Sequence, residues 1–389
     1  MAQLHWFDAS SLDPFIVFAS FDCQRPSLKN AGRFMTSPEL PFVAKADLPG
    51  VAFSAMRQML LSQAKAADLQ VIEDAHRTLR VQTAHGIIGL RPGNTTEVAG
   101  MVAAADERWL FVMKTAVVDQ MRHVMPNVAE QMRWSNGPAE GSLPPNFMFM
   151  QVRDVVALGP DFLRVTLQGE DVSRHGDAAI HFRLVQPPEG ADAIWPSVAA
   201  NGSISWPEGP GAPHRPVYTT RYVDPSAGTL VTDVYVHEGG RTTTWAQQFM
   251  AGDRARRVIG VIGPSGGGLM EADQVLMAAD ETGFPAAARI LEGLPTHTKG
   301  EVFLEAANGA ACAYPVSAPK GVILKWLARS GGDCLAGAAL AALPRHGGSK
   351  IWFAGERGQA TKLREAAKVG GHAPGDLRIS GFWTQPDGR

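Results

Sequence analysis

Residues 274–294 decide the fold of the second half of the chain, and they read QVLMAADETGFPAAARILEGL. The apolar run over 275–279 predicts a short buried strand, and the pattern over 285–294 predicts a helix. The alternation continues, with strands expected over 301–306, 322–328, 350–354 and 377–381 and helices over 333–343 and 359–369. Because strands that alternate with helices form parallel sheets, we expect an α/β domain over residues 270–389.

Upstream of this segment the pattern changes to short strands separated by turns. The expected strands cover 148–156, 163–167, 180–185, 217–223, 230–236 and 257–262. Such closely spaced strands are typical of an antiparallel sandwich or β-barrel, which we place over residues 144–269. Residues 187–213, rich in Pro, Gly and Ser, are expected to form a long loop between two of the strands.

A run of turn-forming residues, SNGPAEGSLPP at 135–145, separates the barrel from the N-terminal third of the chain. Before it, periodicity predicts helices over 51–66 and 109–125, a hairpin over 78–90 and a strand over 96–104. We therefore expect a small α+β accessory domain over 41–136, preceded by an N-terminal extension over 1–40. The protein is predicted to be multidomain, as its 389 residues suggest.

Composition excludes several classes of protein. With 36 Lys and Arg against 38 Asp and Glu, the net charge of −2 gives no general attraction for nucleic acid or an anionic membrane. No run of about 18 apolar residues occurs, so no membrane-spanning helix is expected. Cys23, Cys312 and Cys334 lack metal-ligand spacing, which argues against a bound metal or a disulfide framework. Asp8 and Asp13 interrupt any signal-peptide pattern, so we expect a cytoplasmic protein.

The segment RPVYTTRY at 215–222 lies on one of the expected barrel strands. Alternation places Tyr218 and Thr220 on one face of this strand, and Thr219 and Arg221 on the other. An aromatic ring can stack on a flavin, a hydroxyl can bond its polar edge, and a guanidinium can bind a pyrophosphate in bidentate fashion. Taken alone, the segment is equally compatible with an ordinary edge strand whose polar residues point outward.

The segment HEGGRTTTWA at 237–246 follows the strand expected over 230–236. His237 and Gly240 lie in a turn, and Thr243, Thr244 and Trp245 come where a short helix is expected to begin. Hydroxyls and free backbone N–H groups at a helix N-terminus bind anions such as a dinucleotide pyrophosphate. Without a partner motif, the segment is also compatible with a plain capped helix.

Together these segments resemble the siderophore-interacting flavoproteins, a branch of the ferredoxin reductase-like superfamily. The resemblance runs from Phe149 to the C-terminus and rests on motifs at 156–171, 218–221, 237–246, 252–253 with 263–264, 280–285, 326–329, 354–356 and 381–383. It implies an FAD-binding barrel followed by an NAD(P)H-binding-like domain. It further implies that electrons pass from NAD(P)H, or from reduced ferredoxin, through FAD to a ferric siderophore, which then releases its iron.

The resemblance also implies where FAD contacts the barrel. Tyr218 and Thr220 are expected near the isoalloxazine ring. The pyrophosphate is expected near Arg221 and the turn at 240–244, and the ribose or adenine near Asp233 or Tyr235. The family carries an arginine two residues before the tyrosine, where this chain has Pro216 after Arg215. The pyrophosphate contact is therefore left to either Arg221 or Arg215.

The nicotinamide nucleotide is expected at the carboxyl ends of the parallel strands, where ligands bind in open α/β sheets. The matching motif residues there are Asp280, Glu281, Thr282, Gly355 and Glu356. Arg329 is expected to pair with a 2′-phosphate, which would favour NADPH. Trp383 either covers the flavin face or fills the core.

Two further departures affect this second domain. Ala279 and Gly283 replace the residues that the family has beside Asp280, a change expected to alter nicotinamide affinity. Thr384, Gln385 and Pro386 stand where the family often has arginines. Cationic side chains for an anionic chelate are plentiful in the domain but mark no pocket: Lys320, Lys325, Arg329, Arg345 and Lys350.

The N-terminal third has a resemblance of its own. Residues 44–134 resemble an uncharacterised small α+β domain that occurs alone in bacteria and also fused ahead of siderophore-interacting modules. That resemblance implies no chemistry, and we interpret the domain as an accessory or dimerisation domain.

Two other functions compete with the reductase. The sequence GPSGG at 263–267 fits the nucleophile elbow of hydrolases, with Asp333 and His346 or His372 following in the required order. The elbow needs a helix directly after the serine, and the glycines at 266–268 disfavour one. The same run lacks the Lys-Ser or Lys-Thr of a P-loop. The other rival is a siderophore-binding or sensing protein that contains flavin without reductase turnover.

Overall fold

The computed structural model describes residues 40–66, 69–93, 97–176, 179–188, 192–250 and 258–385. The expected extension over 1–40 therefore lies outside the described residues, apart from Leu40. The described residues form two compact units. One contains residues 149–185 and 215–385, and the other contains residues 40–148 and 186–214.

The N-terminal domain is a five-stranded antiparallel sheet in the order β1-β5-β4-β3-β2. Its elements are β1 (Phe42–Pro49), α1 (Phe53–Ala66), β2 (Val71–Ala75), β3 (Thr78–Thr83), β4 (Gly86–Pro92), β5 (Glu97–Ala104), α2 (Glu107–Val124) and α3 (Pro126–Gln131). Asp106 caps α2 by accepting a hydrogen bond of 2.8 Å from the backbone of Trp109. The helices, the hairpin and the strand expected here are present, and β1, β2 and α3 were not predicted.

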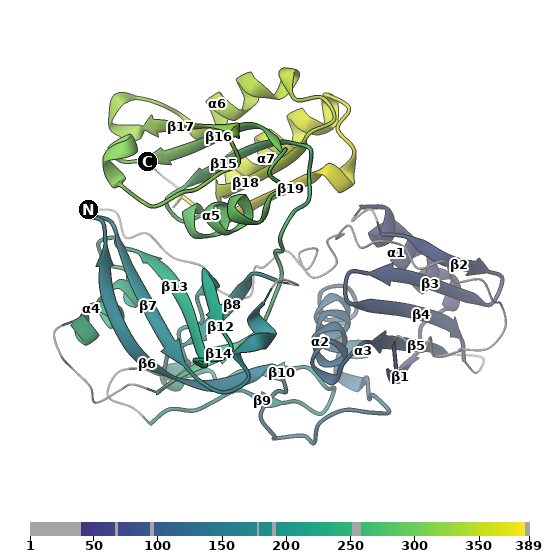
Figure 1. The fold of residues 1–389 in the computed structure, drawn as a ribbon. Coiled ribbons are helices and arrows are strands. Elements are labelled where there is room, and N and C mark those ends of the chain that lie inside the picture. The colour runs from purple at the N-terminus through teal and green to yellow at the C-terminus, as the bar shows by residue number, and fades with distance from the viewer. Residues whose placement is uncertain are drawn as a thin grey trace. The chain divides into compact units, whose positions relative to one another are not determined.

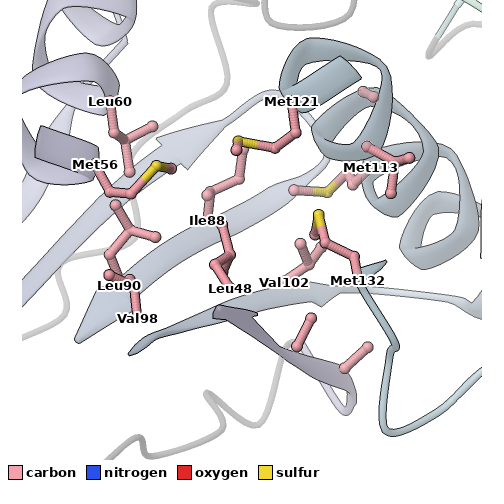
Figure 2. Close-up of a cluster of buried hydrophobic side chains, with 14 of the residues drawn as sticks. Leu48, Met56, Leu60, Ile88, Leu90, Val98, Val102, Met113, Met121 and Met132 are labelled. Carbon is pink, nitrogen blue, oxygen red and sulfur yellow. The ribbon is translucent and has the colours of Figure 1, made fainter. Parts of the chain in front are cut away.

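One face of this sheet packs against α1 and α2 around a cluster of aliphatic and methionine side chains. Figure 2 shows Met56 and Leu60 of α1 and Met113 and Met121 of α2 lying over strand residues such as Ile88. Each of these side chains is at most 7% exposed. Because every second residue of the strands enters this cluster, burial of apolar surface fixes their register.

Residues 186–214 contain the short strands β9 (Ser197–Val198) and β10 (Ile204–Ser205). The Asn201 side chain donates to the Ala129 carbonyl at 3.1 Å, and Arg122 donates to the Ser203 hydroxyl at 3.2 Å. This excursion between two barrel strands therefore packs against α2 and α3 and belongs to the compact unit of the N-terminal domain. The domain boundaries inferred from the sequence, which count it with the barrel, remain predictions.

The second domain is a seven-stranded sheet in the order β11-β8-β14-β6-β7-β13-β12 (Figure 1). Its elements are β6 (Phe147–Leu158), β7 (Phe162–Gln168), β8 (His181–Val185), β11 (Val217–Thr219), β12 (Tyr222–Asp224), β13 (Thr229–Tyr235), α4 (Arg241–Met250) and β14 (Val258–Ile262). The strand expected over 217–223 is two strands, because β11 pairs with β8 and β12 pairs with β13. A single segment thus joins the two edges of the sheet and closes the barrel.

The C-terminal domain is a five-stranded parallel sheet in the order β17-β16-β15-β18-β19. Its elements are β15 (Gln274–Asp280), α5 (Phe284–Gly293), β16 (Lys299–Ala306), β17 (Gly321–Ala328), α6 (Leu335–Ala342), β18 (Lys350–Glu356), α7 (Arg357–Val369) and β19 (Leu377–Trp383). Helix α5 packs on one face, and α6 and α7 pack on the other (Figure 1).

The order of the parallel strands reverses between β15 and β18, which places a ligand-binding crevice at their carboxyl ends. The multidomain fold predicted from the sequence, with an α+β domain, an antiparallel barrel and a parallel α/β sheet, is confirmed. Among the described helices, none has the length and hydropathy that crossing a bilayer requires.

Candidate functional site

The first group of predicted site residues lies on β11 and the junction that follows it. Tyr218 is half-buried and its hydroxyl is hydrogen-bonded to the Thr242 side chain; burial raises the pKa of Tyr218 to about 12, so it is a neutral phenol. The Thr219 hydroxyl lies 3.3 Å from Nδ1 of His181 on β8. Tyr218 therefore connects the predicted flavin strand to the N-terminus of α4.

Thr220 is fully buried, and its hydroxyl has no hydrogen-bond partner among the described residues. Burying a hydroxyl without a hydrogen-bond partner costs about 1–3 kcal/mol of stability. Native structures therefore rarely contain one without a structural or functional reason. The backbone around it is held firmly: the Thr220 N–H donates to the Ile180 carbonyl at 2.8 Å, and the Arg221 N–H donates to the Val231 carbonyl at 2.7 Å. An orphaned polar atom at this point fits a polar cofactor edge nearby.

Arg221 is held by protein groups. Its side chain is completely buried and forms two hydrogen bonds with the Glu292 carboxylate, at 3.0 and 2.8 Å. Nη2 also donates to the Tyr222 hydroxyl at 2.8 Å, and Nε lies 3.7 Å from the Asp233 carboxylate. Although burial acts to lower it, the Glu292 hydrogen bond holds the pKa of Arg221 above its ordinary value. Arg215 is half-buried two residues before β11, and the choice between the two arginines as pyrophosphate ligand remains a prediction.

Asp233 and Tyr235 lie on β13 in different environments. Asp233 is 1% exposed and accepts two hydrogen bonds from Arg164, at 2.8 and 2.9 Å, and one from the Tyr314 hydroxyl at 2.7 Å. Tyr235 is half-buried, and its ring stacks on His237 with centroids 6.0 Å apart. Of the two, Tyr235 is the one that is partly exposed, next to His237 of the phosphate turn. Contact of either residue with the ribose or adenine remains a prediction.

The predicted phosphate turn precedes α4. The Gly240 N–H donates to the His237 carbonyl at 3.2 Å, and a Cβ at position 240 would lie 2.6 Å from His237 Nε2 and 2.7 Å from Thr243 Oγ1. The first intrahelical hydrogen bond runs from the Thr244 N–H to the Gly240 carbonyl, at 2.9 Å. The N–H groups of the residues before Thr244 therefore lie ahead of the intrahelical bonds, as they do at the N-terminus of any helix. Trp245 packs edge-on against Phe249. This turn fits a diphosphate, and with Tyr218 and Thr220 it gives FAD suitable binding residues.

A second group of predicted residues converges at the carboxyl edge of the parallel sheet. Asp280 ends β15 and is 2% exposed. One carboxylate oxygen accepts hydrogen bonds from the backbone and hydroxyl of Thr282, at 2.9 and 2.5 Å, and the other accepts from the Trp383 indole at 2.6 Å. Burial raises the pKa of Asp280 to about 6. Asp280 therefore links Thr282 to Trp383, a contact that the sequence did not predict.

Glu281 and Arg329 form the adjoining part of this edge. Arg329 donates to Glu281 at 2.6 and 3.2 Å and to Glu305 at 3.4 Å, while 43% of its side chain stays exposed. Glu281 also accepts from the Ala307 backbone at 2.9 Å. The Arg329 guanidinium is thus anchored on one side and open to solvent on the other.

Gly355 and Glu356 end β18 beside the same edge. A Cβ at position 355 would lie 3.0 Å from the Asp280 carboxylate and 3.3 Å from the Phe353 ring. Glu356 caps α7 by accepting from the Gln359 backbone at 2.8 Å. Gly355 therefore permits close approach to Asp280, whereas the Glu356 carboxylate is engaged by its own helix. Contacts of these residues with a nicotinamide nucleotide remain predictions.

Sequence reasoning missed several residues that hold the flavin strand: Arg164, His175, His181, Arg289, Glu292 and Tyr314. Burial lowers the pKa of His181 to about 4, so its ring is neutral, and it also contacts Phe382 edge-on at 5.6 Å. One signal was available. Arg289 and Glu292 are charged residues at helical spacing in the otherwise apolar stretch FPAAARILEG.

The hydrolase motif does not form a nucleophile elbow. Residues 263–273, which follow β14, contain no helix, and the Ser265 N–H donates to the His181 carbonyl at 2.7 Å. The motif residues Gly252 and Asp253 lie outside the described residues. Within the described part of the chain, no group of three or more His, Cys, Asp or Glu residues is arranged to bind a metal ion.

Comparison with known proteins agrees with this architecture. The model of the siderophore-interacting FAD-binding domain matches residues 151–268, and that of the siderophore-interacting protein matches residues 272–386. The NADPH-dependent ferric-chelate reductase of Escherichia coli is 30% identical over 243 residues, which cover 61% of this chain and 92% of that protein. This chain belongs to the siderophore-interacting protein family. The resemblance inferred from the sequence is confirmed, as is an FAD-binding domain in the barrel.

Two further relatives match part of this chain. The ferric vibriobactin reductase ViuB of Vibrio cholerae is 33% identical over 180 residues, or 43% of this chain, and the chain spans 62% of the length of that relative. A siderophore utilization protein from T. fusca, known from its crystal structure, superimposes with a TM-score of 0.52 at 29% identity. That match covers 64% of this chain and 97% of the other. Both family models begin after the N-terminal domain.

Proposed function

We propose that this protein is an FAD-dependent ferric-siderophore reductase that takes electrons from NAD(P)H, with reduced ferredoxin as an alternative donor. The observation that supports it best is that one compact unit joins an FAD-binding barrel to a parallel sheet, at whose switch point Asp280 is hydrogen-bonded to both Thr282 and Trp383. Relatives named as a ferric-chelate reductase and a ferric vibriobactin reductase support the same activity.

When bound, FAD supplies a group that accepts a hydride and passes on single electrons, so one NAD(P)H reduces two ferric ions to ferrous ions and releases one proton. The residues of the chain bind and orient the cofactor and the electron donor. The turn before α4 would hold the diphosphate, and Tyr218, beside that turn, would contact the ring system. The carboxyl edge of the sheet would hold the nicotinamide nucleotide, with the exposed side of Arg329 open to a 2′-phosphate.

The ferric siderophore is the proposed substrate, and the cytoplasm is the proposed place of reaction. Three of the cationic side chains of the α/β domain are already engaged by carboxylates. Lys325 and Arg345 both pair with Glu301, at 3.0 and 3.3 Å, and Lys350 pairs with Asp376 at 2.9 Å. We therefore expect the chelate to be held mainly by shape and by contact with the cofactor rather than by these cations.

Anaerobic stopped-flow mixing tests the proposal against the rival flavin-containing binding or sensing protein. The FAD-loaded protein should lose its visible absorption on mixing with NADPH, NADH or reduced ferredoxin. Absorption should return when a ferric tris-catecholate siderophore is added, with two ferrous ions trapped by a chromogenic chelator for each NAD(P)H consumed. If none of the three donors bleaches the flavin, the proposal that the protein is a reductase is wrong. A shift of the flavin spectrum by the chelate alone would then favour the binding protein.

A further inference from the structure

Helix α5 of the α/β domain extends two charged side chains into the barrel, at the junction between β11 and β12. The first is Arg289, which is 8% exposed. Its guanidinium donates to the backbone carbonyls of Thr220 and Gly176, and to that of His175 at 3.4 Å. All three acceptors belong to the barrel, so this arginine binds the backbone of the predicted flavin strand.

The second side chain is Glu292, one turn further along α5. It accepts both hydrogen bonds of the bidentate pair with Arg221, although a third of its own side chain is exposed. Arg221 also stacks over the Tyr222 ring, with its guanidinium carbon 4.5 Å from the ring centroid. Arg289 thus binds the Thr220 carbonyl, and Glu292 fixes the side chain of the adjacent residue, Arg221.

These two contacts meet at the one segment that both closes the barrel and contains the flavin motif. Between β11 and β12 the backbone changes partners from β8 to β13, so Thr220 and Arg221 belong to neither regular pairing. The orientation of Tyr218 and Thr220 therefore depends on how this junction is held. Because the FAD site is itself proposed, any role of the junction in binding FAD rests on that proposed function.

We propose that Arg289 and Glu292 are positioning residues for FAD, which act from the neighbouring domain by fixing the Thr220–Arg221 junction. Loss of the Glu292 charge leaves the buried Arg221 guanidinium with Asp233 as its nearest described carboxylate, and that group is already bonded to Arg164 and Tyr314. Arg221 must then move or take up another partner, and the motif residues beside it lose their fixed orientation. FAD affinity therefore depends on α5.

The test is the increase in melting temperature that FAD produces in the full-length protein. Glu292→Gln keeps the shape of the side chain and Arg289→Met keeps most of its length; each should weaken FAD binding about 10-fold, as expected for a lost charged hydrogen bond. A purely structural residue would lower the melting temperature of the apo and FAD-bound protein equally, whereas a positioning residue reduces the difference between them. Glu365→Gln, at an exposed position on α7, is the matched control. It should change neither the melting temperature of the apo protein nor the increase that FAD produces.

A double-mutant cycle separates action through Arg221 from other effects. If Glu292 acts through that residue, Glu292→Gln should have no further effect on FAD affinity in an Arg221→Met background. Additive losses, or a wild-type FAD shift in both Glu292→Gln and Arg289→Met, would overturn the inference. If the wild-type protein itself gives no FAD-dependent shift, the proposed cofactor site fails first, which distinguishes the two failures.

Discussion

The barrel junction and the edge of the parallel sheet use an arginine in opposite ways. Arg221 is wholly buried and bound by Glu292 and Tyr222, whereas Arg329 keeps 43% of its side chain exposed while pairing with two nearly buried carboxylates. A phosphate can approach Arg329 without breaking its buried contacts, but at Arg221 it would have to displace a carboxylate. In this structure Arg221 is bound by protein groups, whereas Arg329 keeps an exposed side that a ligand can reach.

The largest effect should come from removing Asp233. Its carboxylate accepts hydrogen bonds from Arg164 and Tyr314 and lies 3.7 Å from Nε of Arg221. Asp233→Ala leaves buried donors without their acceptor and should lower the free energy of unfolding of the apo protein by about 3–5 kcal/mol, measured by urea denaturation. Asp154→Ala, an exposed carboxylate on β6, should change it by less than about 0.5 kcal/mol. Equal effects would remove the basis for treating the barrel network as framework.

At the sheet edge, Asp280 should produce a pH dependence of stability. Its pKa is about 6 in the fold against an ordinary 3.8, so between these values the folded chain binds the proton more tightly, and stability falls as pH rises. Asp280→Asn should remove this loss and become more stable relative to wild type by on the order of 2 kcal/mol between pH 4 and pH 7. Urea denaturation of both proteins at pH 4, 5, 6 and 7 measures it, and parallel pH profiles would contradict it.

A smaller effect is expected at the turn before α4. Gly240→Ala places a Cβ 2.6 Å from His237 and 2.7 Å from Thr243, which forces the phosphate turn to shift. FAD affinity should fall about 10-fold by fluorescence titration, in line with the cost of overpacking a fixed turn. Gly347→Ala meets nothing within 4 Å and serves as the control. Unchanged affinity would move the diphosphate away from this turn.

The smallest effect should come from the exposed arginine. Arg329→Ala should lower the ratio of kcat/KM for NADPH to that for NADH about fivefold, because a partly exposed ion pair contributes roughly 1 kcal/mol. The ratio cancels any general loss of activity from leaving Glu281 and Glu305 without this partner. Lys325→Ala, on β17 just before Arg329, should leave the ratio unchanged. If Arg329→Ala does so as well, the 2′-phosphate lies elsewhere.

Much of the fold was predictable because periodicity reports burial. The β15 strand is buried at six of its seven positions, so its apolar run identified it. In contrast, β2 has Val71, Ile72, Asp74 and Ala75 exposed and no alternation, so no pattern revealed it. The strand expected over 217–223 was divided because its backbone changes neighbours, and no side-chain pattern records a change of hydrogen-bond partner.

The site shows the same limit. Asp280, Thr282 and Gly355 were expected at one sheet edge because parallel strands end together, and a Cβ at Gly355 would lie 3.0 Å from the Asp280 carboxylate that binds Thr282. The roles of Arg289 and Glu292 were not predicted, since both act on residues about 70 positions away, at separations of 69 and 71. Trp383 was left between two interpretations. Its bond to Asp280 gives it a defined partner without deciding whether it also covers the flavin.

The separation between the barrel junction and α5 also sets an order of events during synthesis. Chains emerge from the ribosome N-terminus first, and domains tend to fold as they appear. Thr220 and Arg221 emerge 69 and 71 residues before the helix residues that bind them. A nascent chain halted after β14 contains every strand of the barrel but not the helix that fixes the junction. On the proposed role of Arg289 and Glu292, such a chain binds FAD more weakly than the completed one, which makes tight cofactor binding a late step in the life of this chain.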